Sequence, residues 1–462
     1  MACNISEGLP EEVITSSADR KEPVSIEALP NEILSQVFGY LDTSPPSHGI
    51  DALHDEPDFD ITRSEDSPLK ACSLASKRWR DVSKSILFKN AQFIVRQNTT
   101  RSIMLSQQMK PFFDFVLANS LRHINSFSLI VYDSRVTDNA KSERRLDDFA
   151  DFWSLLFRMI DPVSFLIVAP PEALGALTSC RVILTDAWNF DCPCHYLRLQ
   201  RPLGPSHDKA SGPIGGSVES LSSPKDPPVK DLQQSAHVTS TNLFGIRPWD
   251  RLLLNEGSFI KAYATYEFWL RKAPSILQDL FGASAQNDKA HISPTICDME
   301  YIALFPMCGH FADLSENLPR LDRLYCQLVP RNQILSDPKK MVQVESEDLW
   351  MERNASYASL MRELFTSPPS HNYQHLKVFE SGDAADRAAW AMAVEYVKRA
   401  GNGWMVGGDG IFVRKPEDVK PLDGETEVEP STFHGSLIRW AWNGTAELPV
   451  SAYPLYDHPM GP

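Results

Sequence analysis

The N-terminal part of the chain carries apolar residues at helical spacing. From Ser25 onward they recur every three or four positions, which places them along one side of a helix: Leu29, Ile33, Leu34, Val37, Phe38 and Leu41. Ser25 is suited to cap such a helix, and Pro30 is tolerated because backbone N–H groups of a first helical turn have no intrahelical partner anyway. The pattern predicts a helix that begins near Ser25 and ends near Leu41.

The same spacing resumes at residue 69, after a segment of a different kind. Residues 43–68 are acidic, contain several prolines and show no hydrophobic period, so they predict a loop or a disordered insert. Beyond this insert, apolar residues at helical spacing predict further helical structure: Leu69, Cys72, Leu74, Ala75, Trp79 and Val82.

A second apolar pattern, with intervals of three, three and two residues, recurs in the rest of the chain. Its copies are Leu121, Ile124, Phe127, Leu129; Ile160, Val163, Leu166, Val168; Ile296, Met299, Ile302, Leu304; Leu318, Leu321, Leu324, Cys326; and a partial copy at Tyr373, Leu376, Phe379. The pattern resembles the leucine-rich repeat, in which short strands stack on their neighbours. An irregular repeat array and an α/β domain of another kind both stay open.

Three further segments predict helices that pack one side on these strands. The segments Asp148–Ile160, Glu347–Phe365 and Asp386–Arg399 each place apolar residues three or four positions apart. The predicted fold is therefore mixed, α+β or α/β: a three-helix N-terminal module followed by an irregular, leucine-rich-repeat-like array of strands and helices.

Changes in composition divide the chain into six predicted parts. They are a disordered acidic tail at 1–24, the helical module at 25–98 with its insert at 43–68, and a first repeat-like part at 99–200. These are followed by a disordered insert rich in Pro, Gly and Ser at 201–242, a second repeat-like part at 243–430 and a C-terminal tail at 431–462.

Charge and composition exclude several classes of function. The formal net charge of −15 argues against a surface that neutralises nucleic-acid phosphates or adheres to anionic membranes. A run of about 18 apolar residues is missing, and so is an N-terminal apolar stretch, so we expect an intracellular protein of the cytoplasm or nucleus. The eight cysteines are scattered and indicate buried or free thiols.

Three groups of residues contain side chains of the kinds found in catalytic or metal sites. Cys192, Cys194 and His195 resemble half of a zinc site, but buried thiols in a strand are the favoured interpretation. Gly407–Gly410 predicts a turn between strands, and Asp348 with Glu352 predicts a solvated helix face. We therefore expect no catalytic residue, no metal and no cofactor.

The N-terminal words SIEALPNEILSQVFGYLD and LKACSLASKRWRDVSKSILF resemble the F-box. They contain its Leu-Pro opening, its first helix and its closing Lys-Arg-Trp-Arg signature. Two departures are the insert, about 23 residues longer than the family's usual connection at little entropic cost, and Ala75 in a place commonly held by Val. Later words, such as LPRLDRLYCQLVPRN, resemble the C-terminal regions of F-box proteins from filamentous fungi.

The resemblance implies binding to a Skp-type adaptor and, through it, to the cullin of a ubiquitin ligase. A three-helix module is too small to bury all its apolar side chains, which leaves some for a partner. The predicted adaptor-binding residues are Leu29, Pro30, Ile33, Leu34, Val37, Phe38, Leu41, Leu69, Leu74, Lys77 and Trp79.

The implied function is that of a non-catalytic substrate receptor, which binds an unidentified target protein through residues 243–430. This part is rich in aromatic residues: Trp249, Tyr263, Tyr266, Trp269, Trp350, Trp390 and Trp404. The alternative is a scaffold that binds the adaptor outside any ubiquitin ligase.

Overall fold

Strands from most of the chain form one mixed sheet in a computed structural model. The structure describes residues 25–42, 49–62, 68–95, 105–121, 124–132, 144–202, 242–284, 289–365, 371–400 and 403–415. The predicted tails at 1–24 and 431–462, and nearly all of the predicted insert at 201–242, lie outside these residues.

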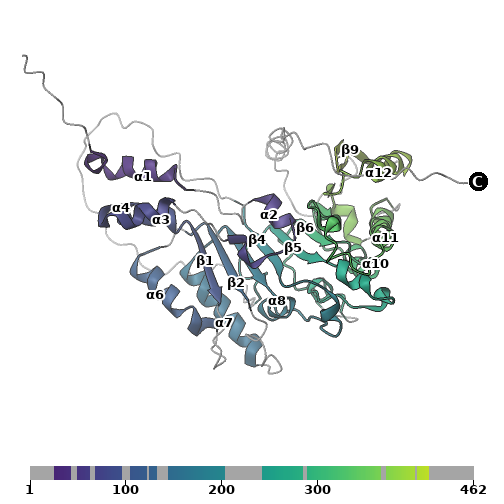
Figure 1. Cartoon of the computed structure of the whole chain (residues 1–462), viewed down its shortest axis with the longest axis horizontal. Coiled ribbons are helices and arrows are strands. Elements are labelled where there is room, and N and C mark those ends of the chain that lie inside the picture. Colours follow the sequence, from purple (N-terminus) through teal and green to yellow (C-terminus); the bar gives the residue numbers. More distant parts are fainter. Residues whose placement is uncertain are drawn as a thin grey trace, which may run out of the picture.

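The ten strands of the described residues lie in the sheet in chain order, except that the last two are exchanged (Figure 1). The strands are β1 (Asn90–Val95), β2 (Ser126–Val131), β3 (Ser164–Ala169), β4 (His195–Gln200), β5 (Arg251–Ser258), β6 (Asp298–Leu304), β7 (Arg323–Gln327), β8 (Val378–Ser381), β9 (Trp404–Gly408) and β10 (Ile411–Arg414). β1 to β3 are parallel, and so are β5 to β8. β4 is antiparallel to both its neighbours, and β10 is antiparallel to β8 and β9.

Helices connect the strands. In the sheet region they are α5 (Leu105–Gln108), α6 (Lys110–Ala118), α7 (Arg144–Met159), α8 (Pro171–Thr178), α9 (Leu277–Leu280), α10 (Cys308–Glu316), α11 (Ser346–Phe365) and α12 (Arg387–Ala400), with short 3-10 turns η5 (Ala187–Asn189), η7 (Ile260–Ala264), η8 (Phe268–Leu270), η9 (Ile334–Ser336) and η10 (His371–His375). The three predicted helices correspond to α7, α11 and α12 and are confirmed.

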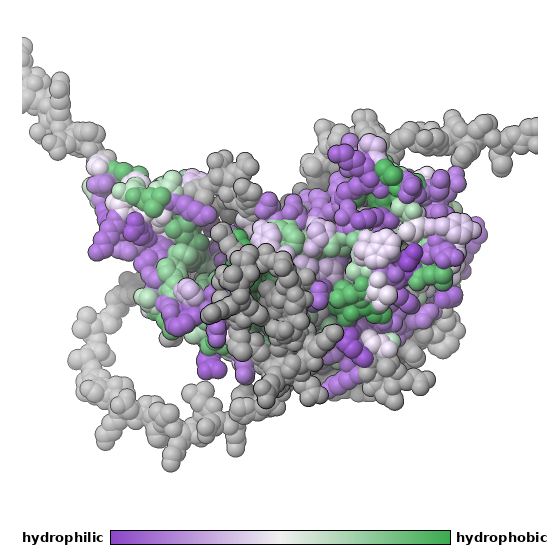
Figure 2. Space-filling view, turned by 60° about the horizontal axis from the view of Figure 1, so that its bottom comes forward, coloured by the Kyte–Doolittle hydropathy of each residue, from purple (hydrophilic) through white to green (hydrophobic). Residues whose placement is uncertain are grey.

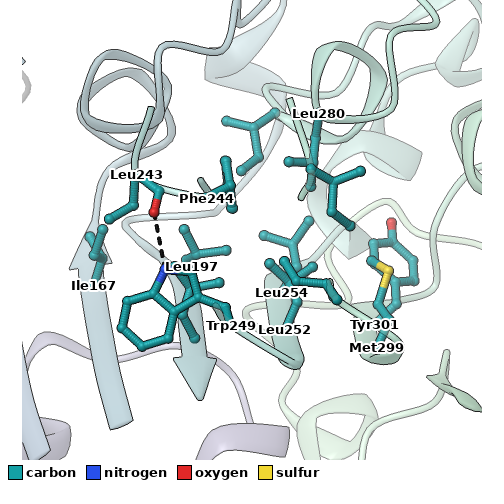
Figure 3. Close-up of a cluster of buried hydrophobic side chains, with 14 of the residues drawn as sticks. Ile167, Leu197, Leu243, Phe244, Trp249, Leu252, Leu254, Leu280, Met299 and Tyr301 are labelled. Atoms are coloured by element: carbon teal, nitrogen blue, oxygen red, sulfur yellow. Dashed lines mark hydrogen bonds between the residues drawn. The ribbon is translucent and has the colours of Figure 1, made fainter. Parts of the chain in front are cut away.

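The largest hydrophobic core lies between the sheet and these helices. Alternate strand residues such as Phe127, Leu254 and Leu324 point into it and meet apolar side chains of the helices. Trp249 is fully buried there, and its Nε1 donates a hydrogen bond to the carbonyl of Leu243 at 3.0 Å (Figure 3). The indole N–H is thus satisfied inside an apolar environment.

The opposite face of the sheet is covered in part by the insert of the N-terminal module. Residues 49–62 form α2 (Ile50–His54) and η3 (Phe59–Thr62), which lie on the other side of the strands from α6, α7 and α8 (Figure 1). Leu53 and Ile61 pack on strand residues in a second core. The prediction of a loop or disordered segment at 43–68 is therefore wrong for this part, because a few apolar residues anchor it; residues 43–48 and 63–67 lie outside the described ranges.

The register of the strands corrects two copies of the repeating pattern. Phe127 pairs with Phe165, whereas the pattern had matched it with Leu166, which points to the opposite face. In the same way Met299, and not Ile302, pairs with Leu324. The fourth copy and the partial copy are in register, since Leu324 pairs with Phe379.

The N-terminal module contains η1 (Ile26–Ala28), α1 (Asn31–Gly39), α3 (Pro68–Ala75) and α4 (Lys77–Leu87). The predicted continuous helix from Ser25 is wrong in one respect: the chain is extended at Leu29 and Pro30, and α1 begins only after Pro30. Ser25 caps the short η1 turn instead. β1 follows α4 closely and forms the edge of the sheet.

The surface of the described residues is mixed in polarity. Hydrophobic residues on the face shown in Figure 2 form small groups among hydrophilic ones. Within the described ranges, every helix is too short or too polar to traverse a lipid bilayer.

Candidate functional site

The N-terminal helices have a small core of their own, separate from those of the sheet. Leu34 and Phe38 of α1 and Leu69 of α3 are buried in it. The Trp79 ring of α4 meets the Phe38 ring edge-on, with 5.2 Å between centroids. This contact joins the two halves of the module on either side of the insert.

Arg78 fixes the start of α1 against the start of α4. Its Nε donates to Asn31 Oδ1 at 2.9 Å, and its two other nitrogens donate to the carbonyls of Glu27 and Leu29. Ser76 caps α4 by accepting a hydrogen bond from the N–H of Trp79 at 3.1 Å. Sequence reasoning did not select Arg78 as a site residue, although it stands in the Lys-Arg-Trp-Arg signature.

The eleven predicted adaptor-binding residues fall into three groups. Three are buried in the small core: Leu34, Phe38 and Leu69. Four are partly buried and pack against it: Leu29, Val37, Leu41 and Trp79. Four are exposed: Pro30, Ile33, Leu74 and Lys77. In this conformation the buried group holds the helices together, and the exposed group is accessible to a partner.

Large apolar side chains remain exposed on the module. Ile33 is 41% exposed and Tyr40 is 90% exposed, and with the half-buried Val37 they follow one side of α1 at intervals of four and three residues. On α3, Leu74 is 75% exposed, and Ile26 of η1 is 44% exposed. Ile26 and Tyr40 were not among the predicted site residues, although their apolar character was visible in the sequence.

A shallow groove between α1 and α4 adds polar groups next to this surface. Its lining residues are Asn31, Glu32, Ser35, Lys77, Arg78, Asp81 and Val82. Apolar anchors with polar groups beside them are the usual composition of a protein-binding surface.

Residues 26–91 match the family model of the F-box-like domain. The chain therefore contains an F-box-like domain. The matched range contains η1, α1, α3 and α4, the whole insert and the first two residues of β1. Comparison with curated proteins and with solved structures gives no match.

F-box proteins are in general non-catalytic adaptors. The structure gives the location of the three groups of residues considered as candidate catalytic or metal sites. Cys194 directly precedes β4 and His195 is the first residue of that strand, and their side chains lie on opposite faces of the sheet. Burial raises the pKa of the Cys194 thiol to about 12, which disfavours the thiolate that zinc requires. Among the described residues no cluster of three or more His, Cys, Asp or Glu side chains could hold a metal ion.

The other two groups differ in outcome. Gly407–Gly410 includes the turn between the antiparallel strands β9 and β10, as predicted. The predicted solvated face at Asp348 and Glu352 is wrong for Glu352, which is buried. Its carboxylate accepts a hydrogen bond from the N–H of Cys308, at the first turn of α10, at 2.6 Å.

Sequence reasoning missed a buried polar cluster on the helix side of the sheet. Glu256 is fully buried at the end of β5; its Oε2 accepts hydrogen bonds from Tyr301 at 2.7 Å and from Nε2 of His310 at 2.8 Å. Ser275 donates to the other oxygen. Because Glu256 and Tyr301 are enclosed, the cluster is a buried network and not an open catalytic pocket. Its members are far apart in sequence, so no motif indicates it.

Proposed function

We propose that this F-box protein is a substrate-receptor subunit of a Skp–cullin–F-box ubiquitin ligase. The single observation that supports this most is the set of exposed apolar side chains on an F-box-like domain: Ile26, Ile33, Tyr40 and Leu74. Water contact with such groups is unfavourable, and burying them beneath a Skp-type adaptor would stabilise the complex. The adaptor would connect the chain to cullin, in the cytoplasm or nucleus.

The role of the chain in this proposal is to position a target. The F-box holds the adaptor, and residues 243–430 contribute to the surface that binds the target protein. Most aromatic residues there belong to the fold, since Trp249, Tyr263 and Trp404 are buried. Tyr266 and Trp269, which are 89% and 56% exposed, are available for contact. Holding the target near the charged conjugating enzyme raises the effective concentration of its lysines.

The proposal is tested by titrating the purified full-length chain with a purified Skp-type adaptor. The double variant Ile33→Ala/Leu74→Ala should bind at least about tenfold more weakly, because truncating a buried interface anchor costs more than about 1 kcal/mol. The matched control is Leu117→Ala, which truncates a leucine on α6 that is 65% exposed. An adaptor that does not bind the wild type, or binds the double variant equally well, contradicts the proposal.

One observation favours the scaffold alternative, namely that residues 49–62 already occupy part of a sheet face that a target could use. A scaffold outside a ligase would bind the adaptor but would not recruit cullin. Reconstitution with adaptor and cullin distinguishes the two functions. Co-elution of all three proteins supports the receptor, and exclusion of cullin supports the scaffold.

A further inference from the structure

Residues 49–62 pack against one face of the sheet, in the way that a peptide ligand packs on a receptor surface. The F-box core contains none of these residues, because its buried members are Leu34, Phe38 and Leu69. The segment instead joins the second core of the sheet, where Leu53 is completely buried. Its apolar surroundings come from strands β2 to β7 and from Cys194, directly before β4: Ile130, Leu166, Val168, Cys194, Tyr196, Leu253, Ile302, Leu304 and Tyr325. We call this surface the insert-binding face.

Side chains of this face hold the backbone of the segment. Asn255 Nδ2 donates to the carbonyls of Leu53 and Asp55, both at 2.7 Å. Gln327 Nε2 donates to the carbonyl of His54 at 3.2 Å, and the Tyr196 hydroxyl donates to that of Asp58 at 2.8 Å. These contacts bind main chain, so a different segment with the same backbone path could accept them.

The face also contacts the side chains of the segment. The His54 ring stacks on Tyr325 with 4.7 Å between centroids, and its Nε2 lies 3.1 Å from Glu300 Oε2. These contacts favour an aromatic ring with an N–H group directly after the buried leucine.

Two cations beside the insert-binding face meet acidic residues of the segment. Arg331 lies 2.8 Å from the carboxylate of Asp51, and Lys340 lies 2.6 Å from that of Glu56. In a chain of net charge −15, these cations make this part of the face suited to an acidic partner.

The close approach of the segment is built into β5. Gly257 has φ +76°, and a Cβ atom placed there would lie 3.2 Å from Cδ of Pro57. Glycine is required by the left-handed backbone and leaves room for the proline. The face therefore complements the segment sterically, at Pro57, as well as electrostatically.

We propose that the insert-binding face is the target-binding surface and that residues 49–62 are its internal ligand. The occupant that competes with them is an acidic segment of the target, with a leucine followed by histidine and with carboxylates on both sides. This inference rests on the proposed receptor function and specifies the class of target. An internal ligand on short linkers has an effective concentration on the order of millimolar, so an external segment binds the wild type weakly.

The experiment uses the full-length chain in which residues 49–62 are replaced by a Gly/Ser segment of the same length. The probe is a fluorescent peptide with the sequence of residues 49–62, GIDALHDEPDFDIT. We expect it to bind the replaced chain at least 100-fold more tightly than the wild type. The same peptide carrying Leu53→Ala should bind at least tenfold more weakly, and a scrambled peptide of identical composition should not bind.

A second variant keeps the experiment decisive if the replaced chain does not fold. Leu53→Ala in the full-length chain weakens the internal ligand and should raise the affinity for the wild-type peptide at least tenfold over the unaltered chain. A folded variant that binds the peptide no better than the wild type overturns the inference and makes the insert a permanent part of the fold.

Adaptor binding, measured on the same preparations, separates this inference from the proposed function. Loss of peptide binding with intact adaptor binding overturns only the inference. Peptide binding without adaptor binding supports the insert-binding face as a peptide surface and contradicts the receptor function.

Discussion

At the scale of single residues, Glu256 and His310 make the stability of the fold depend on pH. Burial raises the pKa of Glu256, but the charge of His310 and its hydrogen bond outweigh this and lower that pKa to about 2. Burial lowers the pKa of His310, but Glu256 outweighs this and raises it above 6.5. The contribution of Glu256 is present above its unfolded pKa of 4.5 and is lost as pH falls toward 2. That of His310 is present below 6.5 and is lost as pH rises through its raised pKa. The pair therefore stabilises the fold most between pH 4.5 and pH 6.5.

The measurement compares the unfolding free energy of the wild type with that of Glu256→Gln/His310→Gln from pH 5 to 9. The difference should be on the order of a few kcal/mol at pH 5.5, and it should shrink as pH rises through the pKa of His310. His195 acts in the opposite direction. Burial lowers its pKa to about 4, so the fold loses the stability that depends on its neutral ring as pH falls below 6.5. Both proteins retain His195, so the difference largely removes its effect. A difference that is constant over the range would rule out the ion pair.

The contrast between buried and exposed residues of the F-box gives another prediction at this scale. Phe38→Ala empties a site in the small core and should destabilise the F-box by about 3–5 kcal/mol. Leu74→Ala changes an exposed side chain and should alter stability by less than about 0.5 kcal/mol. Both should weaken adaptor binding, but only Phe38→Ala should lower the urea midpoint. Equal loss of stability in the two variants would show that Leu74 is a core residue and not a docking residue.

At the scale of elements, the sequence predicts helices better than it predicts strand register. The helix α11 was predicted within one residue, because apolar residues such as Leu349, Leu360 and Leu364 recur along it at helical spacing. β3 is buried on both faces, so Leu166 and Phe165 are equally apolar and nothing in the pattern decides which of them faces the helices.

The ordered structure of residues 49–62 was not predicted, for a different physical reason. In residues 49–62 the buried apolar residues Leu53, Pro57 and Ile61 are few and stand among five carboxylates, so the composition is that of a disordered segment. The order of the segment comes from contacts with distant residues such as Asn255, about 200 residues away in the chain, and no local pattern carries that information. The buried cluster around Glu256 was not predicted for the same reason, since Tyr301 of β6 and His310 of α10 meet it only in the folded chain.

Asn255→Asp should release the insert while leaving the sheet intact. The carboxylate can still accept the hydrogen bond from Gly257, but it repels the carbonyls of Leu53 and Asp55 that the amide held. Hydrogen exchange should show loss of protection in residues 50–62 and unchanged protection in β2 and β3. Asn119→Asp is the control, because it breaks an amide-to-carbonyl bond of the same kind on α6. Protection that stays unchanged in the insert would contradict the role of Asn255.

At the scale of the whole molecule, the insert adds links between the F-box and the sheet. The direct junction is small: α4 leads into β1, the rings of Phe88 and Phe115 lie 4.9 Å apart, and Lys89 accepts a hydrogen bond from Asn125. The insert adds two further connections. Asp42 and Gly49 are seven residues apart and Thr62 and Pro68 six, so each pair is separated by at most about 25 Å and about 22 Å. The F-box is thereby connected to the sheet at three points.

This arrangement predicts that detaching the insert frees the F-box to move. Leu53→Asp places a charge among the apolar residues of the insert-binding face, where its desolvation is unfavourable, and should expel the segment. Small-angle X-ray scattering should then give a larger radius of gyration and a longer tail in the distance distribution, with unchanged circular dichroism. Leu117→Asp, on the exposed side of α6, should leave both scattering quantities as in the wild type. If Leu53→Asp also leaves them unchanged, the junction between α4 and β1 is rigid by itself. The orientation of the F-box, and with it the direction in which a target is presented, would then be set without the insert.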